Sequence, residues 1–159
     1  MFVLLDIDGV LVTTPSWKSV ELLADGFMKF NEMATKNLNL FCQNREIKIV
    51  LTSTHRISYE ENIWKEIFAF RGLNFDKISK INKISKINNV SKIENLNSRI
   101  VEIENWVGRQ EIPTTYIIID DDISLYGLPQ NIKERWICTK PLLGFNEIAL
   151  QQALRLLED

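Results

Sequence analysis

Carboxylates are concentrated at two places in this sequence, each directly after an apolar run. Asp6 and Asp8 are two residues apart in the stretch Asp-Ile-Asp-Gly-Val, where Gly9 lets the backbone leave its strand. Asp120 and Asp121 open a run of three aspartates. If the fold brings these groups together, their mutual repulsion is unfavourable unless a cation lies among them. Oxygen donors alone suit Mg²⁺ better than Zn²⁺. A single aspartate pair could equally serve as a helix cap or turn, but two such clusters favour a magnesium site.

Such a site could transfer a phosphoryl group. A carboxylate beside Mg²⁺ can attack phosphorus and form an aspartyl-phosphate, while a second carboxylate exchanges protons with the leaving oxygen and with water. A hydroxyl group and a cation should hold the remaining phosphoryl oxygens. Ser53 or Thr52, after the second apolar run, offers the hydroxyl. Arg99 is the leading candidate for the cation, and Arg56 is close enough in sequence to the hydroxyls to contact the same substrate.

These groups need a scaffold that brings distant parts of the chain together. Short, continuously apolar runs predict strands buried on both faces, at residues 2–5, 47–51, 116–119 and 135–138. Helical spacing of apolar residues predicts helices within 16–43, 58–71, 99–107 and 145–157. The alternation predicts an α/β fold of three Rossmann-like layers, with a mainly parallel sheet between helices. Ligands bind at the carboxyl ends of the strands in such sheets, where the polar clusters fall.

Composition limits the class of protein. A length of 159 residues suits one domain over 1–159, and 45% apolar with 25% charged residues excludes a largely disordered chain. The net charge of −2 excludes nucleic-acid binding driven by overall charge. Cys42 and Cys138 are far apart and outside any metal-binding spacing, and His55 is the sole histidine. With an N-terminal apolar run too short for a signal peptide and no membrane span, we expect a cytoplasmic protein.

The segment 77–98 departs from both regular patterns. Ile, Val or Leu recurs at every third residue from 78 to 96, with Ser, Asn and Lys between. This period fits neither a helix nor a strand, so we interpret the segment as a low-complexity insertion on the surface. Alternatively, it forms a basic lip or lid over a phosphate site, made by Lys77, Lys80, Lys83, Lys86 and Lys92.

The Asp-x-Asp-Gly-Val stretch resembles the first motif of the haloacid dehalogenase (HAD) superfamily of aspartate-nucleophile phosphohydrolases. The resemblance implies that Asp6 is the nucleophile and that Asp8 is the general acid and base. It also implies that Asp6, the backbone carbonyl of Asp8 and the later acidic pair bind Mg²⁺, and that Gly9 lies at the substrate.

The other three motifs of the superfamily follow in the same order. The second, a Ser or Thr after an apolar strand, falls at Ser53, or at Thr52 if the register slips by one. The third is a Lys or Arg before the acidic strand, for which Arg99 fits and Lys92 is the alternative. The fourth, an acidic pair after an apolar strand, falls at Asp120 and Asp121.

A narrower likeness is to the HAD-like domains of Swiss-army-knife RNA repair proteins, and it covers most of the chain. Their pattern after the second strand resembles Thr-Ser-x-Trp-Arg, with His55 here in place of Trp. Later elements match at Arg99, Glu102, Ile103, Trp106, Val107, Gly144 and Phe145.

Together, these features predict a Mg²⁺-dependent phosphomonoester hydrolase. The segment 12–46 holds little more than a helix or two, so we expect little or no cap domain and an open site. An open site suits a phosphorylated RNA or DNA end, with a nucleotide or sugar phosphate as the alternative. A second class of function is a phosphate-binding or regulatory module without appreciable turnover. Asp8 disfavours a regulatory module of the receiver type, because such modules lack a general acid and base at this position.

Overall fold

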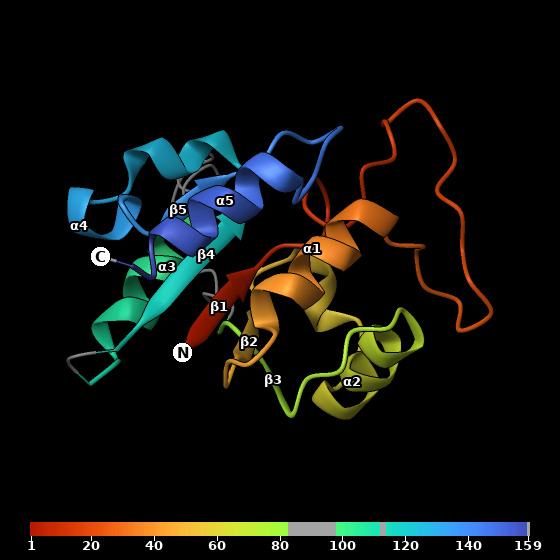
Figure 1. Cartoon of the computed structure of the whole chain (residues 1–159), viewed down its shortest axis with the longest axis horizontal. Helices are drawn as coiled ribbons and strands as arrows, with labels where there is room; N and C mark the ends of the chain where they lie inside the picture. The colour runs from red at the N-terminus through yellow and green to blue at the C-terminus, as the bar shows by residue number, and fades with distance from the viewer. Residues whose placement is uncertain (83–97, 112–113, 159) are drawn as a thin grey trace, which may run out of the picture.

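The computed structural model describes residues 1–82, 98–111 and 114–158, and these form an α/β fold around one parallel sheet (Figure 1). The strand order within the described residues is β3-β2-β1-β4-β5, and every neighbouring pair is parallel. The strands are β1 (Phe2–Leu5), β2 (Lys48–Leu51), β3 (Lys77–Lys80), β4 (Tyr116–Asp120) and β5 (Trp136–Cys138). This arrangement confirms the predicted Rossmann-like fold class.

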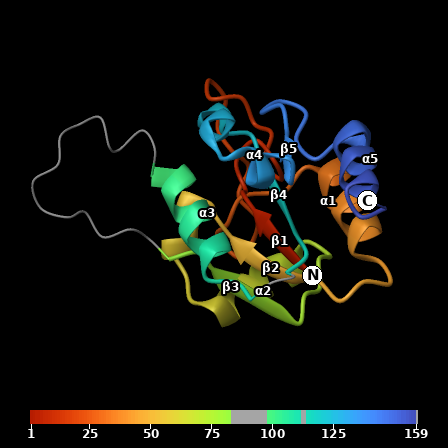
Figure 2. The ribbon, with the colours of Figure 1, turned by 90° about the vertical axis from the view of Figure 1, so that its left-hand side faces the viewer.

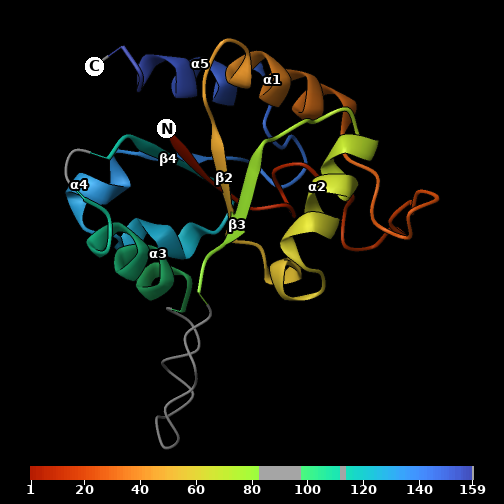
Figure 3. The same cartoon turned by 90° about the horizontal axis from the view of Figure 1, so that it is seen from below.

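Helices cover both faces of the sheet (Figures 2 and 3). Alternate residues of β1 enter different cores: Val3 and Leu5 pack with α1, α2 and α5, whereas Leu4 packs with α3 and α4. The helices are α1 (Glu32–Cys42), α2 (Glu61–Phe70), α3 (Ser98–Gly108), α4 (Gln130–Lys133) and α5 (Glu147–Arg155). Two layers of helix and a sheet buried on both sides explain why the strand sequences are continuously apolar.

Of the helix or two expected within 16–43, with a possible break at Gly26, only α1 forms, in the second half of the stretch. Residues 13–31 instead make an excursion without a helix, seen in Figure 1 between β1 and α1. Gly26 has φ +79°, a left-handed conformation that ends any helix, and Asn31 starts α1 by accepting a hydrogen bond from Ala34 N. The excursion therefore adds no helix over the sheet.

The period-three segment begins inside the sheet, and β3 was not expected there. Ile78 and Ile81 are three residues apart, so they point to opposite faces, and each is buried in a different core. The first residues of the segment therefore form an edge strand, and the helices on both faces of the sheet explain why isoleucines three residues apart are both buried. Lys77 pairs with Lys48 at the amino end of the sheet, away from Asp6, so it forms no part of a lip over the site. Lys83, Lys86 and Lys92 lie outside the described residues.

Candidate active site

The register of the three central strands brings the polar clusters together. Leu5 on β1 pairs with Leu51 on β2 and with Ile119 on β4, so the residues that follow these three lie at the same level, at the carboxyl edge of the sheet. These residues are Asp6, Thr52 and Asp120. Backbone hydrogen bonds of 3.0 Å, from Asp6 N to Ile119 O and from Thr52 N to Leu5 O, continue the pairing to this point. The carboxyl ends of β1, β2 and β4 therefore form the site, as the sequence predicted.

Three carboxylates share one small volume at this edge of the sheet. One oxygen each from Asp6, Asp120 and Asp121 lies within 4.8 Å of the others. Asp6 and Asp120 are buried, and burial raises the pKa of Asp6. Burial and the charge of Asp6 raise the pKa of Asp120 to about 6, while burial and the charge of Asp120 raise that of Asp121 to about 6. Burial and mutual repulsion therefore both disfavour the ionised form of these carboxyl groups.

Arg99, in the first turn of α3, is the cation that faces the cluster. Its Nη1 contacts Asp120 Oδ2, lies 3.7 Å from Asp6 Oδ1 and donates a hydrogen bond of 3.3 Å to Thr52 Oγ1. Burial by itself would lower the pKa of Arg99, but the charges of Asp120 and Asp6 outweigh it and raise that pKa. Among the residues that the structure describes, one guanidinium thus faces three carboxylates, and this set of oxygen donors fits a divalent cation such as Mg²⁺.

The two candidate hydroxyl groups have different surroundings. Thr52 is buried, and its Oγ1 is 3.5 Å from Asp120 Oδ2 as well as bonded to Arg99, so it faces the acidic cluster. Ser53 is also buried, but its Oγ accepts a hydrogen bond of 3.3 Å from His55 N and so caps the 3-10 turn over Thr54–Ile57.

Asp8 lies apart from the three clustered carboxylates. Its side chain is 56% exposed, and its Oδ2 is 2.8 Å from His55 Nε2. Gly9, the next residue, has φ +68°, and a Cβ built on it would lie only 2.1 Å from Asp121 Oδ2. A glycine is therefore required for the turn after β1 to pass against Asp121.

Arg56 does not face the carboxylates, although we expected it to contact the substrate. Its Nε donates to Ile81 O, its Nη1 to the backbone oxygens of Thr52 and Ser53, and its Nη2 to Glu102 Oε1 at 2.8 Å. All three guanidinium nitrogens thus bind protein groups, and the side chain is buried. Arg56 therefore holds the turn after β2 against α3.

Two contacts at the site were not predicted from the sequence. The first is the ion pair between Arg56 and Glu102. A weak signal for it existed, because Glu102 belongs to the same short motif as Arg99 and a buried arginine needs an acidic partner. The contact between His55 and Asp8 had none, because 47 residues separate the two positions. Only the adjacency of β1 and β2 brings them together.

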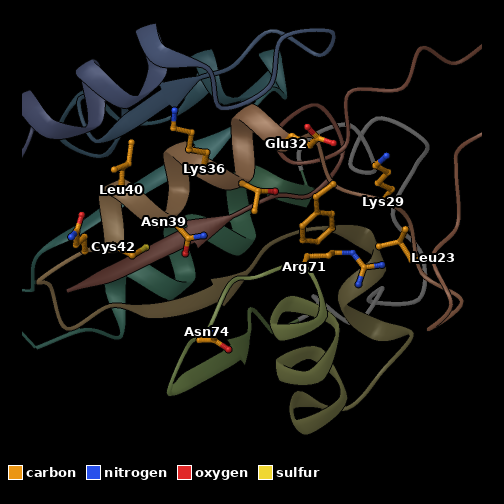
Figure 4. Close-up of a pocket in the computed structure, with 12 residues that line it drawn as sticks. Leu23, Lys29, Glu32, Lys36, Asn39, Leu40, Cys42, Arg71 and Asn74 are labelled. Carbon is orange, nitrogen blue, oxygen red and sulfur yellow. The ribbon is translucent and has the colours of Figure 1, made fainter.

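A surface groove lies apart from this site, between α1 and the chain that follows α2 (Figure 4). Lys36 and Asn39 of α1 line one side, and Arg71 and Asn74 line the other. None of the three clustered carboxylates belongs to it, so the groove is separate from the acidic site.

A family comparison agrees with the fold and the acidic site. The model of the HAD domain in Swiss Army Knife RNA repair proteins matches residues 2–150, and the chain belongs to this family. Membership points to chemistry of the phosphohydrolase type, and the acidic cluster is compatible with a bound metal. No curated protein and no solved structure matches the chain significantly. In the part of the chain that the structure describes, every helix is too short or too polar to cross a membrane.

Proposed function

We propose that the chain is a Mg²⁺-dependent phosphomonoester hydrolase that works through an aspartyl-phosphate. The observation that carries the proposal is the division of the carboxylates. Asp6 is buried beside Arg99 and two further carboxylates, whereas Asp8 stands outside that cluster and is exposed. The charge of Arg99 favours the ionised form of Asp6, which a nucleophile needs, whereas the exposed Asp8 can exchange protons with a leaving group and with water.

The metal would be held by the carboxylates of Asp6, Asp120 and Asp121. When bound, Mg²⁺ would screen the repulsion between the anionic nucleophile and the phosphoryl group. The donor set fits this ion, since three carboxylate oxygens lie within 4.8 Å of one another.

The reaction divides into two steps at Asp6. In the first, a carboxylate oxygen of Asp6 bonds to phosphorus, the bond from phosphorus to the leaving oxygen breaks, and Asp8 gives its proton to that oxygen. In the second, the Asp8 carboxylate takes a proton from water while the water oxygen bonds to phosphorus and releases Asp6. Arg99 holds Asp6 in place and, with the hydroxyl groups of Thr52 and Ser53, offers donors to the phosphoryl oxygens.

A phosphorylated end of RNA or DNA is the substrate class that we propose first, with a nucleotide second. The family is named for RNA repair proteins, and the excursion 13–31 adds no helix that could restrict the site to small molecules. A cytoplasmic location belongs to the same proposal and is supported by the two free thiols, Cys42 and Cys138.

Hydrolysis of p-nitrophenyl phosphate and of 5′- and 3′-phosphorylated oligonucleotides, with Mg²⁺ or with a chelator, tests the proposal. We expect the wild type to need the metal, and Asp6→Asn to abolish turnover while still folding. Metal-independent turnover, or an active Asp6→Asn variant, would contradict it. Mg²⁺-dependent binding of BeF₃⁻ without turnover of any ester would favour the phosphate-binding module instead.

A further inference from the structure

The single histidine of the chain contacts the proposed general acid. His55 Nε2 lies 2.8 Å from Asp8 Oδ2. We assign Nε2–H as the donor, because a carboxylate oxygen only accepts hydrogen bonds. In the part of the chain that the structure describes, the other oxygen of Asp8, Oδ1, has no hydrogen-bond partner and can serve the substrate.

The imidazole is itself held in place. The ring of Phe27 packs edge-on against it, with the centroids 5.7 Å apart and the planes at 87°. The backbone of His55 is fixed by two bonds, one from His55 N to Ser53 Oγ and one from Ser58 N to His55 O. The side chain is only 34% exposed. His55 is therefore a more rigid group than the exposed carboxylate that it binds.

Phe27 in turn belongs to a tightly packed aromatic group. Its ring lies 5.2 Å from that of Trp64 and 6.0 Å from that of Tyr59, and the guanidinium of Arg71 lies 5.4 Å from its centroid. Contacts on several sides leave the ring little freedom. The orientation of the imidazole is thus set by the core on the α2 side of the sheet.

We infer that His55 is a positioning residue that orients Asp8 for proton transfer, an inference that rests on the proposed function. The Nε2–H bond to Oδ2 fixes the plane of the carboxyl group, so that Oδ1 carries the proton toward the leaving oxygen. As the bond from phosphorus to that oxygen breaks and Asp6 bonds to phosphorus, the proton passes from Oδ1 to the leaving group. Asp8 becomes a carboxylate, and its bond from Nε2–H is kept throughout.

The choice of leaving group separates this role from a purely structural one. A nitrophenolate leaves without a proton, whereas an alkoxide requires one, so only alkyl esters depend strongly on the general acid. His55→Phe keeps a ring against Phe27 and removes the donor. His55→Gln keeps an N–H donor and removes the ring. Tyr59→Leu disturbs the same aromatic group without touching Asp8 and is the matched control.

The experiment measures kcat and KM of each variant on p-nitrophenyl phosphate and on ethyl phosphate, after thermal melting has confirmed folding. We expect His55→Phe to lower kcat for the alkyl ester about 10- to 100-fold more than for the aryl ester, with KM little affected. His55→Gln should recover most of this selective loss, and Tyr59→Leu should lower both rates by the same factor. In the double variant with Asp8→Asn, the loss of His55 should have no further selective effect.

Different results would overturn the positioning role of His55 and the proposed function. An active wild type whose His55→Phe variant loses both esters equally, or neither, would overturn the positioning role alone. A wild type that hydrolyses no phosphomonoester, or that stays active as Asp6→Asn, would overturn the proposed function and this inference with it.

Discussion

Arg99 is the residue on which the charge balance of the acidic cluster depends. It contacts Asp120, approaches Asp6 and donates to Thr52, and these three groups come from three different strands. Among the candidates for the cation, Arg56 is fully engaged by protein groups, and Lys92 lies outside the described residues. The geometry thus favours Arg99.

Replacing Arg99 should lower activity more than replacing any neighbouring basic residue. We expect Arg99→Ala to lower kcat/KM by about 100-fold, because it removes a preorganised cation from the nucleophile and the phosphoryl oxygens. Arg99→Lys should lose less, since the charge remains. A steady-state comparison with Lys80→Ala, whose Nζ bonds Tyr59 O, provides the control. A change of less than about threefold in Arg99→Ala would move the role to Lys92.

At the scale of elements, two buried or half-buried ion pairs join segments that the sheet alone does not connect. Arg56 links the turn after β2 to Glu102 of α3. Arg71, at the end of α2, binds Asp25 with Nη1 and Nη2 and Met28 O with Nε. Both arginines therefore fix loops that border the site.

Loss of Glu102 should destabilise the fold strongly. Glu102→Ala leaves the buried Arg56 unpaired, for which we expect a loss of about 3 kcal/mol in the free energy of unfolding. Glu102→Gln should cost less, because its amide oxygen still accepts from Nη2. Urea denaturation of the three proteins measures this difference. Equal stability of the two variants would mean that the charge of Glu102, and not its hydrogen bond, is what matters.

The pair between Asp25 and Arg71 should depend on pH. The hydrogen bond from Arg71 holds the pKa of Asp25 below its usual value of 3.8. A lowered pKa in the folded state contributes stability above about pH 4, and this contribution disappears as the pH falls through that lowered pKa. We expect Asp25→Asn to lower stability by about 1 kcal/mol at pH 7 and to match the wild type more closely near pH 3. Thermal melts across this range test the trend, and a constant gap would contradict it.

The sequence predicted those elements whose patterns are local. Four strands were expected within one residue of their observed bounds, because each is buried on both faces and so is continuously apolar. The fifth, β3, was missed because Ile78 is its single buried residue and stands among lysines and a serine, so the strand is not continuously apolar. Helical spacing over 16–43 predicted one helix or, with a break at Gly26, two, and this was wrong before residue 32. There the conformation of Gly26 and the aromatic contacts of Phe27 prevail over the spacing.

The part of the site that could be predicted from the sequence is the part that follows from strand topology. Because carboxyl ends of adjacent parallel strands meet, the grouping of Asp6, Thr52 and Asp120 followed from the strand assignment. The contacts of His55 and Arg56 depend on how the turn after β2 is bent and on which strands are neighbours. No local pattern encodes either of these.

At the scale of the whole molecule, binding of Mg²⁺ should be coupled to folding. The carboxylates proposed as metal ligands follow β1 or lie at the end of β4, and folding alone brings them together. A ligand that binds only the folded state stabilises it, by about 2.7 kcal/mol at 100 times its dissociation constant.

We therefore expect Mg²⁺ to raise the Tm of the wild type and a chelator to reverse the effect. Asp121→Asn, which removes one of the carboxylates proposed to bind the metal, is the variant to compare with the wild type. The raised pKa of Asp121, to about 6, means that its charge is unfavourable in the folded state at pH 7, so the metal-free variant should be more stable by about 1 kcal/mol. Its response to Mg²⁺ should be much smaller. An undiminished response would place the metal elsewhere.

Arg56 also has a consequence for how this protein could be altered. It bonds to Ile81 on one side of the stretch 83–97 and to Glu102 on the other, so the two flanks are held together by a residue that lies outside the stretch. We therefore expect an affinity tag or a fluorescent reporter inserted between these two flanks to leave the contacts of Arg56 in place.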